Sequence, residues 1–499
     1  MSTCLLTSGQ IARQRLKFRR TTILTAGFVG VLAGLGLSRL GYYVALDAVL
    51  LLALLALLRL PRRSLVSLLL AVACGLSAGL WRGGEFMAQV DPYQYLYGER
   101  VVFTATAIED AVYGYGSQLL FDVKNPAFET DEEPLALPGR IRVSGFGEKM
   151  VYRGDVVEVE GKFRSTRGGK QGRISYAQLA VVRHGGTPVD GVRREFAAGM
   201  QSALPEPMAS FGLGLLTGQR STLPEQTTDD LSTVGLTHIV AVSGYNLTII
   251  VLFVQRFMAQ RSKYQTVLFA GLFMSLFLAV TGLNAAIVRA AIVSTLSLAA
   301  WYYGRSFRPL LLISMVAAGT AMWSPLYIWG DLSWYLSFLA FFGVLVVAPA
   351  LTKLFFGNRE PKIVAQTLLE TSSAQIMTIP LTLFVFQRTS LVALVSNMLV
   401  VPLIPLAMLF SLVAGLAGML MPTASGWFAW PARIVLTYAL DVAAALARVP
   451  HALVHYSITA QGLALLYAAL VLWVVGLYAR LRTGKTVRRP AKVHYKLAS

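Results

Sequence analysis

Cysteine, histidine and the common catalytic motifs are scarce in this chain of 499 residues. The two cysteines, Cys4 near the basic N-terminus and Cys74 inside an apolar run, are poorly placed to pair, so no disulfide framework is indicated. The five histidines are scattered, and the sequence contains neither an HExxH motif nor a GxxxxGK[ST] phosphate loop. We therefore expect no metal, no cofactor and no built-in nucleotide hydrolysis.

Charged residues are also few, at 14% of the chain, whereas 55% of residues are hydrophobic and the mean hydropathy is +0.60. This composition is too apolar for a soluble enzyme and indicates a polytopic α-helical membrane protein. The formal net charge of +19 is largely explained by cytoplasmic loops, which collect Lys and Arg whatever the function.

The N-terminal part predicts a cytoplasmic start followed by three membrane spans. Five basic residues between positions 13 and 20 precede apolar runs at 21–38, 43–58 and 64–81. No persuasive cleavage site follows the first run, so we interpret it as a retained anchor. We assign residues 1–84 to this part, which leaves the next segment outside the cytoplasm.

Residues 85–195 lose the membrane hydropathy and alternate with a period of two, which predicts an extracytoplasmic β domain. Turn residues separate five expected strands. Five short strands are typical of a small barrel of the OB type. The expected strands are 101–107, 118–123, 140–143, 155–160 and 175–181.

A Gly-rich basic loop in this domain is a candidate surface for a phosphate backbone. Aromatic residues flank its cations and are suited to stack on bases. The alternative is a solvated loop on a domain that only supports the membrane part. The candidate residues are Phe163, Arg164, Arg167, Lys170, Arg173 and Tyr176.

Residues 196–235 are mixed in polarity and predict amphipathic surface helices. Nine apolar runs follow within residues 236–480, which we assign to one multi-span domain. Lys and Arg stand after the first, third, fifth and last of these runs, which fits cytoplasmic turns there. With the first three, this gives about twelve spans and two cytoplasmic termini, the last residues, 481–499, being a basic tail.

Residues 235–247 open the first of these nine runs and carry polar groups at His238, Ser243 and Asn246. Polar side chains in hydrocarbon usually face a bundle interior or a watery path, although a His or a Ser-Gly pair also serves helix packing. On a straight helix these three side chains would diverge, but a break at Ser243-Gly244 would bring them together.

Three further membrane segments contain unusual polar residues. Arg289 lies inside a span and needs a partner or water. Asp331 begins a segment with Trp334 and Ser337, where it either caps the helix or joins a polar path. Asn397 followed by Pro402 marks a broken helix. Four such sites in one bundle favour a polar path, whereas a His238–Ser243 hydrolytic pair lacks an orienting third group.

These segments resemble the ComEC family of DNA-uptake channels. The similarity lies in residues 237–244, preceded by 214–220, in residues 331–340, in Arg289-Ala290, and in Asn397 with Pro402. The order of parts, with N-terminal spans, an OB-like domain and a multi-span competence domain, is similar as well. Two residues depart from the family pattern, since Asn246 stands where a second His is often found and Tyr335 stands where Gln often is.

The resemblance implies an inner-membrane channel that passes single-stranded DNA into the cytoplasm during natural transformation. It also implies a DNA receptor outside and a helicase or strand-binding protein in the cytoplasm. Many members continue into a metallo-β-lactamase-like domain that is not found in this sequence, which implies conduction without cleavage. The alternatives are a transporter of a smaller anionic or lipid-linked substrate and, less favoured, an intramembrane hydrolase.

Overall fold

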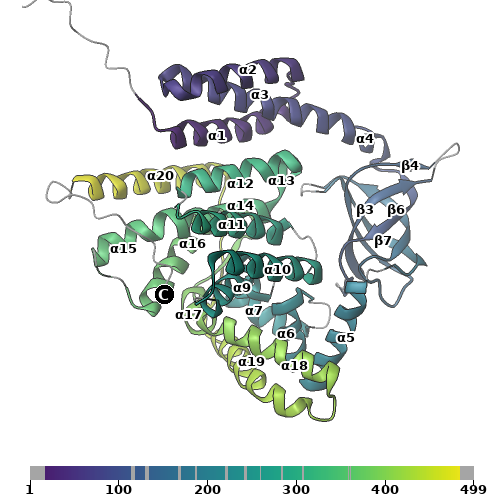
Figure 1. The fold of residues 1–499 in the computed structure, drawn as a ribbon. Helices are drawn as coiled ribbons and strands as arrows, with labels where there is room; N and C mark the ends of the chain where they lie inside the picture. The colour runs from purple at the N-terminus through teal and green to yellow at the C-terminus, as the bar shows by residue number, and fades with distance from the viewer. Residues whose placement is uncertain are drawn as a thin grey trace, which may run out of the picture. The chain divides into compact units, whose positions relative to one another are not determined.

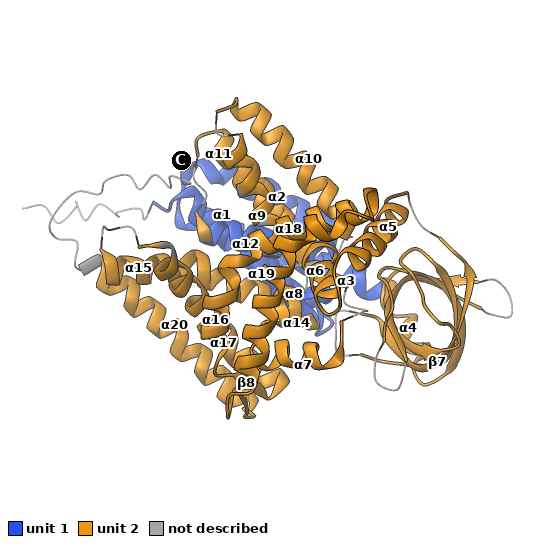
Figure 2. Ribbon diagram, turned by 90° about the horizontal axis from the view of Figure 1, so that it is seen from below, with its two compact units in different colours: residues 1–88, 310–329 blue, residues 89–309, 330–499 orange. Residues whose placement is uncertain are grey.

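The computed structural model forms two compact units, coloured separately in Figure 2. One unit contains residues 1–88 and 310–329, and the other contains residues 89–309 and 330–499. The structure describes residues 17–113, 118–129, 134–166, 170–185, 188–219, 223–240, 244–258, 260–281, 285–305, 308–357, 359 and 361–483.

Small residues bring two helices of the first unit into close contact. A Cβ atom on Gly30 or Gly34 of α1 would collide with backbone atoms of α3, and one on Gly75 or Gly79 of α3 would collide with backbone atoms of α1. Close approach of this kind replaces the hydrophobic effect between helices in lipid, because it maximises van der Waals contact. The unit consists of α1 (Arg20–Ser38), α2 (Leu46–Arg59), η1 (Leu60–Arg62), α3 (Leu65–Val90), α12 (Pro309–Trp323) and α13 (Leu326–Gly330).

The second unit begins with α4 (Tyr93–Leu96) and a closed β-barrel, drawn in blue-grey in Figure 1. The five main strands are connected in the order β1-β6-β7-β5-β3, and β3 pairs back with β1 to close the barrel. Only the β5–β7 pair among these is parallel. The strands are β1 (Arg100–Ala107), β2 (Val112–Tyr113), β3 (Leu119–Phe128), β4 (Leu135–Ala136), β5 (Arg140–Phe146), β6 (Val156–Arg164) and β7 (Gly172–Arg183).

The five strands predicted from the period-two pattern are confirmed, and the barrel is consistent with the OB-like prediction. Alternate side chains point inward, as the burial of every second residue along β1 shows. The interior is rich in aromatic rings, and Tyr93 of α4 packs into it with Phe103, Phe128 and Phe163.

Most of the described remainder of the second unit is helical. They are α5 (Pro188–Ala203), α6 (Met208–Thr217), α7 (Glu225–Thr233), α8 (Thr237–Val240), α9 (Gly244–Phe257), α10 (Lys263–Thr281), α11 (Ala285–Tyr302), α14 (Leu332–Phe342), η3 (Gly343–Val347), α15 (Ala348–Phe356), α16 (Ile363–Phe386), α17 (Ala393–Val400), η4 (Val401–Leu403), α18 (Ile404–Leu420), α19 (Ser425–Ala447) and α20 (Ala460–Thr483). A short hairpin pairs β8 (Arg388–Ser390) with β9 (Leu453–His455).

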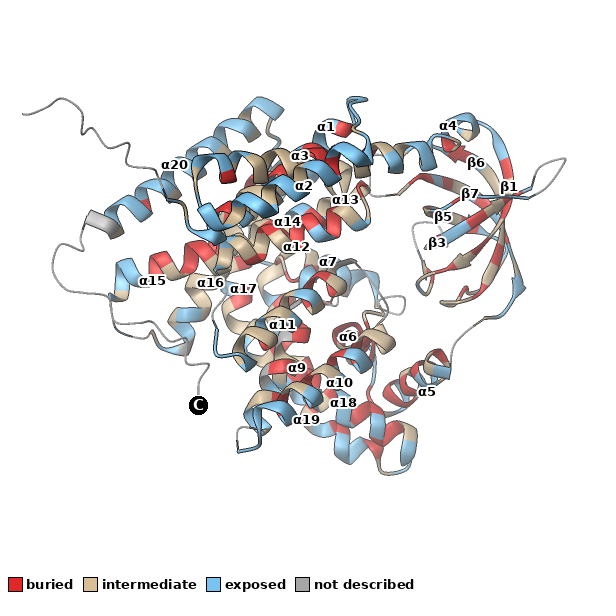
Figure 3. Ribbon diagram, turned by 45° about the horizontal axis from the view of Figure 1, so that its top comes forward, coloured by how far each residue is buried: buried red, intermediate tan, exposed pale blue. Residues whose placement is uncertain are grey.

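The segment predicted as amphipathic surface helices differs from that expectation at α6. Eight of its ten residues are buried, within a core shared by α5, α18 and α19 (Figure 3). The physical reason is its composition, since α6 is apolar on all sides and such a helix must be covered. α5 leads from the barrel to α18, where Gly199 lies against Gly415 and Gly418.

Within the described residues, eight helices are long and apolar enough to cross a membrane. The predicted count of about twelve is therefore not confirmed, because several predicted spans coincide with shorter helices such as α2, α9 and α12. The eight are Arg20–Ser38, Leu65–Leu96, Lys263–Thr281, Leu332–Phe356, Val364–Phe386, Ala393–Leu420, Ser425–Ala447 and Ala460–Leu481.

Candidate functional site

Three arginines form a row across the outside of the barrel. Arg142 on β5 is in register with Arg173 on β7, and Arg173 is in register with Arg164 on β6. All three side chains are exposed. Neighbouring strands lie about 5 Å apart, so the arginine row presents three cations along a short line that crosses the strands. Such a line can neutralise several phosphates of a chain laid across the barrel.

Asp122 of β3 anchors one end of the arginine row. Its carboxylate accepts a hydrogen bond of 3.0 Å from Arg142 Nε and also pairs with Lys170 Nζ. Burial lowers the pKa of the Lys170 ammonium, and the Asp122 carboxylate opposes this effect. The charge of Lys170 is therefore largely balanced by Asp122 within the barrel, whereas Arg164 and Arg173 have exposed side chains.

Phe163 was predicted to stack on bases, and the structure contradicts this. Its side chain is fully buried in the barrel, stacked on Tyr97 with ring centroids 5.4 Å apart. The reason is strand alternation, since Arg164 faces outward on β6 and its neighbour must therefore face inward. That alternation is the signal in the sequence that could have corrected the assignment.

An exposed aromatic pair occupies the outer surface of β5 and β7 instead. Tyr176, which was predicted, is 75% exposed, and its ring lies 6.5 Å from that of Phe146. Tyr176 lies at a register shift between these strands and has a φ of 59°, which turns its side chain outward. Phe146 was not singled out from the sequence. Arg167 lies outside the described residues.

The polar stretch at residues 235–247 is linked to α6 through Asn246. The buried Asn246 Nδ2 donates a hydrogen bond of 2.9 Å to the carbonyl oxygen of Leu215. Leu215 lies in the last turn of α6, where carbonyls lack helical partners. The other polar residues of this stretch are described less fully. His238 is exposed, and its Nδ1 lies 3.0 Å from the carbonyl oxygen of Gly235. Gly244 is the first residue of α9, and Ser243 lies outside the described residues.

Arg289 of α11 is brought to the start of α14. It is 1% exposed, and its Nη2 donates to the carbonyl oxygen and to the Oγ of Ser333, at 3.1 and 3.2 Å. The Asp331 Oδ1 accepts a hydrogen bond of 3.2 Å from the backbone N–H of Trp334, so Asp331 caps α14. Trp334 is buried against Phe338. Two roles are predicted for Asp331, a helix cap and part of a polar path. This hydrogen bond shows the cap directly.

The predicted broken helix at Asn397 and Pro402 is present as α17, η4 and α18. Pro402 lies in η4, the 3₁₀ turn between the two α-helices, as expected of a residue that interrupts the hydrogen-bond ladder. Asn397 is buried, and its Oδ1 has no hydrogen-bond partner among the described residues. Ser396 beside it donates to the carbonyl oxygen of Val234 at 2.7 Å. Ser337 is half-buried in α14.

Metal ligands are not grouped in the described part of the chain, where no three His, Cys, Asp or Glu side chains are placed to hold an ion. The arrangement instead combines a cationic barrel surface with a bundle whose buried polar side chains join segments distant in sequence.

A comparison with protein families matches residues 215–482 to the family described as Competence protein. Comparisons with curated proteins and with solved structures find no match. The family match covers more than half of the chain and includes Asn246, Arg289, Asp331 and Asn397. The chain therefore belongs to the competence protein family, as a multi-pass membrane protein with a part in DNA uptake.

Proposed function

We propose that this protein is an inner-membrane channel that passes single-stranded DNA into the cytoplasm. The arginine row beside the exposed Tyr176–Phe146 pair is the observation that carries the proposal. Cations neutralise phosphates and release counterions, while aromatic rings stack on unpaired bases of any sequence. The barrel therefore offers both interactions that sequence-independent binding of a single strand requires.

The bundle supplies the route across the membrane. Irregular backbone at membrane depth is tolerated where it is buried in protein or lines a cavity. The interruption at η4, between α17 and α18, is such a position in this proposal. Asn397 of α17, Asn246 of α9 and Arg289 of α11 add buried polar groups to the bundle. In this proposal the barrel lies outside the cytoplasm, both termini lie inside, and His238 and Ser243 lie near the channel mouth.

Strand movement requires an energy source outside the chain, because the sequence has no nucleotide-binding motif. We therefore include a cytoplasmic helicase or strand-binding protein that pulls the strand inward, and a receptor that delivers DNA to the barrel. The lipid bilayer is the remaining partner.

The test compares two arginines of the same strand. Arg173 and Arg183 are both exposed on β7, but only Arg173 lies in the arginine row. The full chain in lipid nanodiscs should bind a labelled single-stranded oligonucleotide with affinity that falls steeply with salt. Arg173→Gln should lower the salt slope by about 0.7, the value for one phosphate contact on a single strand, whereas Arg183→Gln should leave it unchanged.

A transformation assay with the same two variants connects binding to uptake. Fewer transformants with Arg173→Gln than with Arg183→Gln, at equal protein levels in the membrane, are expected. If the wild-type protein binds no single-stranded DNA at low salt, the transporter of a smaller anionic or lipid-linked substrate becomes the better explanation.

A further inference from the structure

A pocket of about 470 Å³ lies where the barrel meets α5. Its walls come from the barrel segments around Asp110 and around Tyr152, from α5, and from Gln219 beyond the end of α6. This volume is within the range of small-molecule sites, about 300–1,000 Å³. None of its residues belongs to the arginine row.

Two ion pairs hold the pocket together. Arg193 Nη2 of α5 lies 2.8 Å from Asp110 Oδ2, and Arg153 Nε lies 3.4 Å from Asp190 Oδ1. The backbone N–H of Arg153 also donates to Asp110 Oδ1 at 3.0 Å. Both carboxylates of the pocket lining are therefore engaged by an arginine.

Two cations of the lining remain after this pairing. Lys149 and Arg194 are exposed and make no ion pair within the described chain. Four cations against two carboxylates leave the pocket positively charged. Because the two acids are already paired, an anion entering the pocket would meet Lys149 and Arg194.

Aromatic rings form the other part of the wall. Tyr113 is 54% exposed, and Tyr152 carries the Arg194 guanidinium above its ring, 5.7 Å from the ring centroid. A cation beside an aromatic face is suited to a ligand that has both a phosphate and a planar base.

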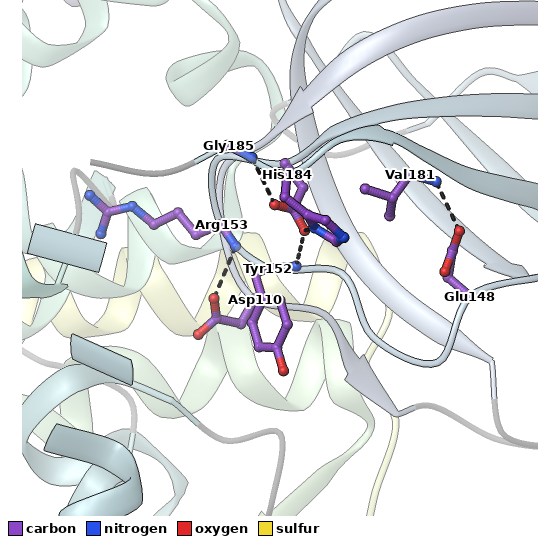
Figure 4. Close-up of polar contacts among 8 residues, drawn as sticks. Asp110, Glu148, Tyr152, Arg153, Val181, His184 and Gly185 are labelled. Carbon is purple, nitrogen blue, oxygen red and sulfur yellow. Dashed lines mark hydrogen bonds and ion pairs between the residues drawn. The ribbon is translucent and has the colours of Figure 1, made fainter. Parts of the chain in front are cut away.

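The Tyr152 wall is positioned by Asp155, which is fully buried. Figure 4 shows the dashed hydrogen bonds that start from the backbone N–H groups of Tyr152 and Gly185. Asp155 Oδ2 accepts a hydrogen bond of 2.9 Å from the backbone N–H of Tyr152, and Oδ1 accepts one of 3.1 Å from Gly185. These bonds tie the Tyr152 turn to the end of β7. A wall fixed in this way loses little conformational entropy when a ligand binds.

The pocket adjoins the arginine row along the chain. The negative charge of Glu109 favours the protonated forms of Arg142 and Lys170 and so raises the pKa of each. The next residue, Asp110, pairs with Arg193 in the pocket. On the other side, Gln219 follows α6, whose Leu215 carbonyl is bonded by Asn246. The pocket lining thus joins the barrel to α5 and to the residue that follows α6 by two positions.

We propose that this pocket holds one nucleotide of a single DNA strand as the strand passes from the barrel to the membrane helices. Lys149 and Arg194 contact its phosphate, and Tyr113 and Tyr152 contact its base. The inference rests on the proposed function and adds a second contact point to it.

The experiment measures binding of a labelled oligothymidylate to the full chain in nanodiscs over a range of salt concentrations. The double variant Lys149→Gln/Arg194→Gln should lower the salt slope by about 0.7, the value for one neutralised phosphate on a single strand. Tyr152→Leu should weaken binding about fivefold or more, and Tyr152→Phe should retain wild-type affinity because the ring remains. Arg183→Gln serves as the matched control, since it removes a cation outside the pocket.

The possible outcomes distinguish a failure of the pocket inference from a failure of the proposed channel function. If Arg173→Gln weakens binding while the pocket variants bind like wild type, the pocket inference is overturned and the channel proposal stands. If the wild-type protein binds no oligothymidylate, both fail. If thymidine monophosphate binds the wild-type protein but not Lys149→Gln/Arg194→Gln, and oligothymidylate binding is the same in both, the pocket is a free-nucleotide site and the strand inference is overturned.

Discussion

Asn246 Nδ2 lies 2.9 Å from the carbonyl oxygen of Leu215, and both residues are buried. This bond joins the beginning of α9 to the end of α6, so the 214–220 segment that carries part of the family resemblance contacts a residue just beyond the 237–244 segment. A buried carbonyl at a helix end needs such a donor, because it has no helical partner and cannot bond to water.

Replacing Asn246 by Ala should leave the Leu215 carbonyl without this donor and reduce stability by about 1–3 kcal/mol. Thermal unfolding of the purified protein in nanodiscs measures the loss. Gln366→Ala is the control, since that exposed amide donates to Glu370 one turn away and its loss should cost less than about 0.5 kcal/mol. Equal melting temperatures for Asn246→Ala and wild type would contradict a structural role of the bond.

Arg289 and Ser333 allow a graded test. Arg289→Met removes both hydrogen bonds to Ser333 and should cost about 1.5–3 kcal/mol, the range for bonds to charged groups. Ser333→Ala removes only the bond to Oγ and should cost less. Arg289→Lys keeps the charge but not the fork of donors, so it should fall between wild type and Arg289→Met. A melting temperature for Ser333→Ala below that of Arg289→Met would show that the link is not made through the guanidinium.

Asp331 can be tested for capping and for charge separately. Asp331→Asn keeps an acceptor for the Trp334 N–H and should keep stability, whereas Asp331→Ala should lose about 0.5–2 kcal/mol. Transformation frequency is measured alongside unfolding. Normal stability of Asp331→Asn with lost uptake would assign a role to the carboxylate charge beyond the cap.

Phe163 and Tyr176 should respond in opposite ways. Phe163→Ala removes a fully buried ring and should destabilise the barrel by about 3–5 kcal/mol. Tyr176→Leu changes an exposed residue and should leave stability nearly unchanged while weakening binding of single-stranded DNA. Circular dichroism melting and oligonucleotide titration distinguish the two. Weaker DNA binding by a stable Phe163 variant would restore the original assignment.

Alkaline pH should weaken the barrel through Tyr97. Burial raises the pKa of its phenol, whose hydroxyl donates to the Gln171 carbonyl at 2.7 Å. The folded state therefore keeps the proton at pH values where the unfolded chain releases it, so this contribution is complete below about pH 10 and is lost as the pH rises further. Melting temperatures of wild type and Tyr97→Phe are compared at pH values below and above 10. A fall of the same size in both proteins would exclude Tyr97 as the cause.

The sequence by itself determined the main strands and the long apolar helices of this protein. Period-two alternation identified all five main strands, and long apolar runs identified helices at each predicted span. These signals are local, because a strand or a helix is specified by neighbouring residues and their burial. The match over residues 215–482 agrees with the family resemblance carried by short motifs in the same region.

The tertiary structure decided which of these residues meet. The arginine row joins residues 142, 164 and 173 only because strand register aligns them, and Arg289 reaches Ser333 across 44 positions of sequence. The base-stacking prediction for Phe163 is wrong because this residue takes an inward position in the alternation of β6, which points its ring into the barrel. The close packing of α1 on α3 through glycines, the burial of α6 and the pocket at α5 likewise depend on contacts between distant segments. Such contacts are set by packing in three dimensions, which no local pattern encodes.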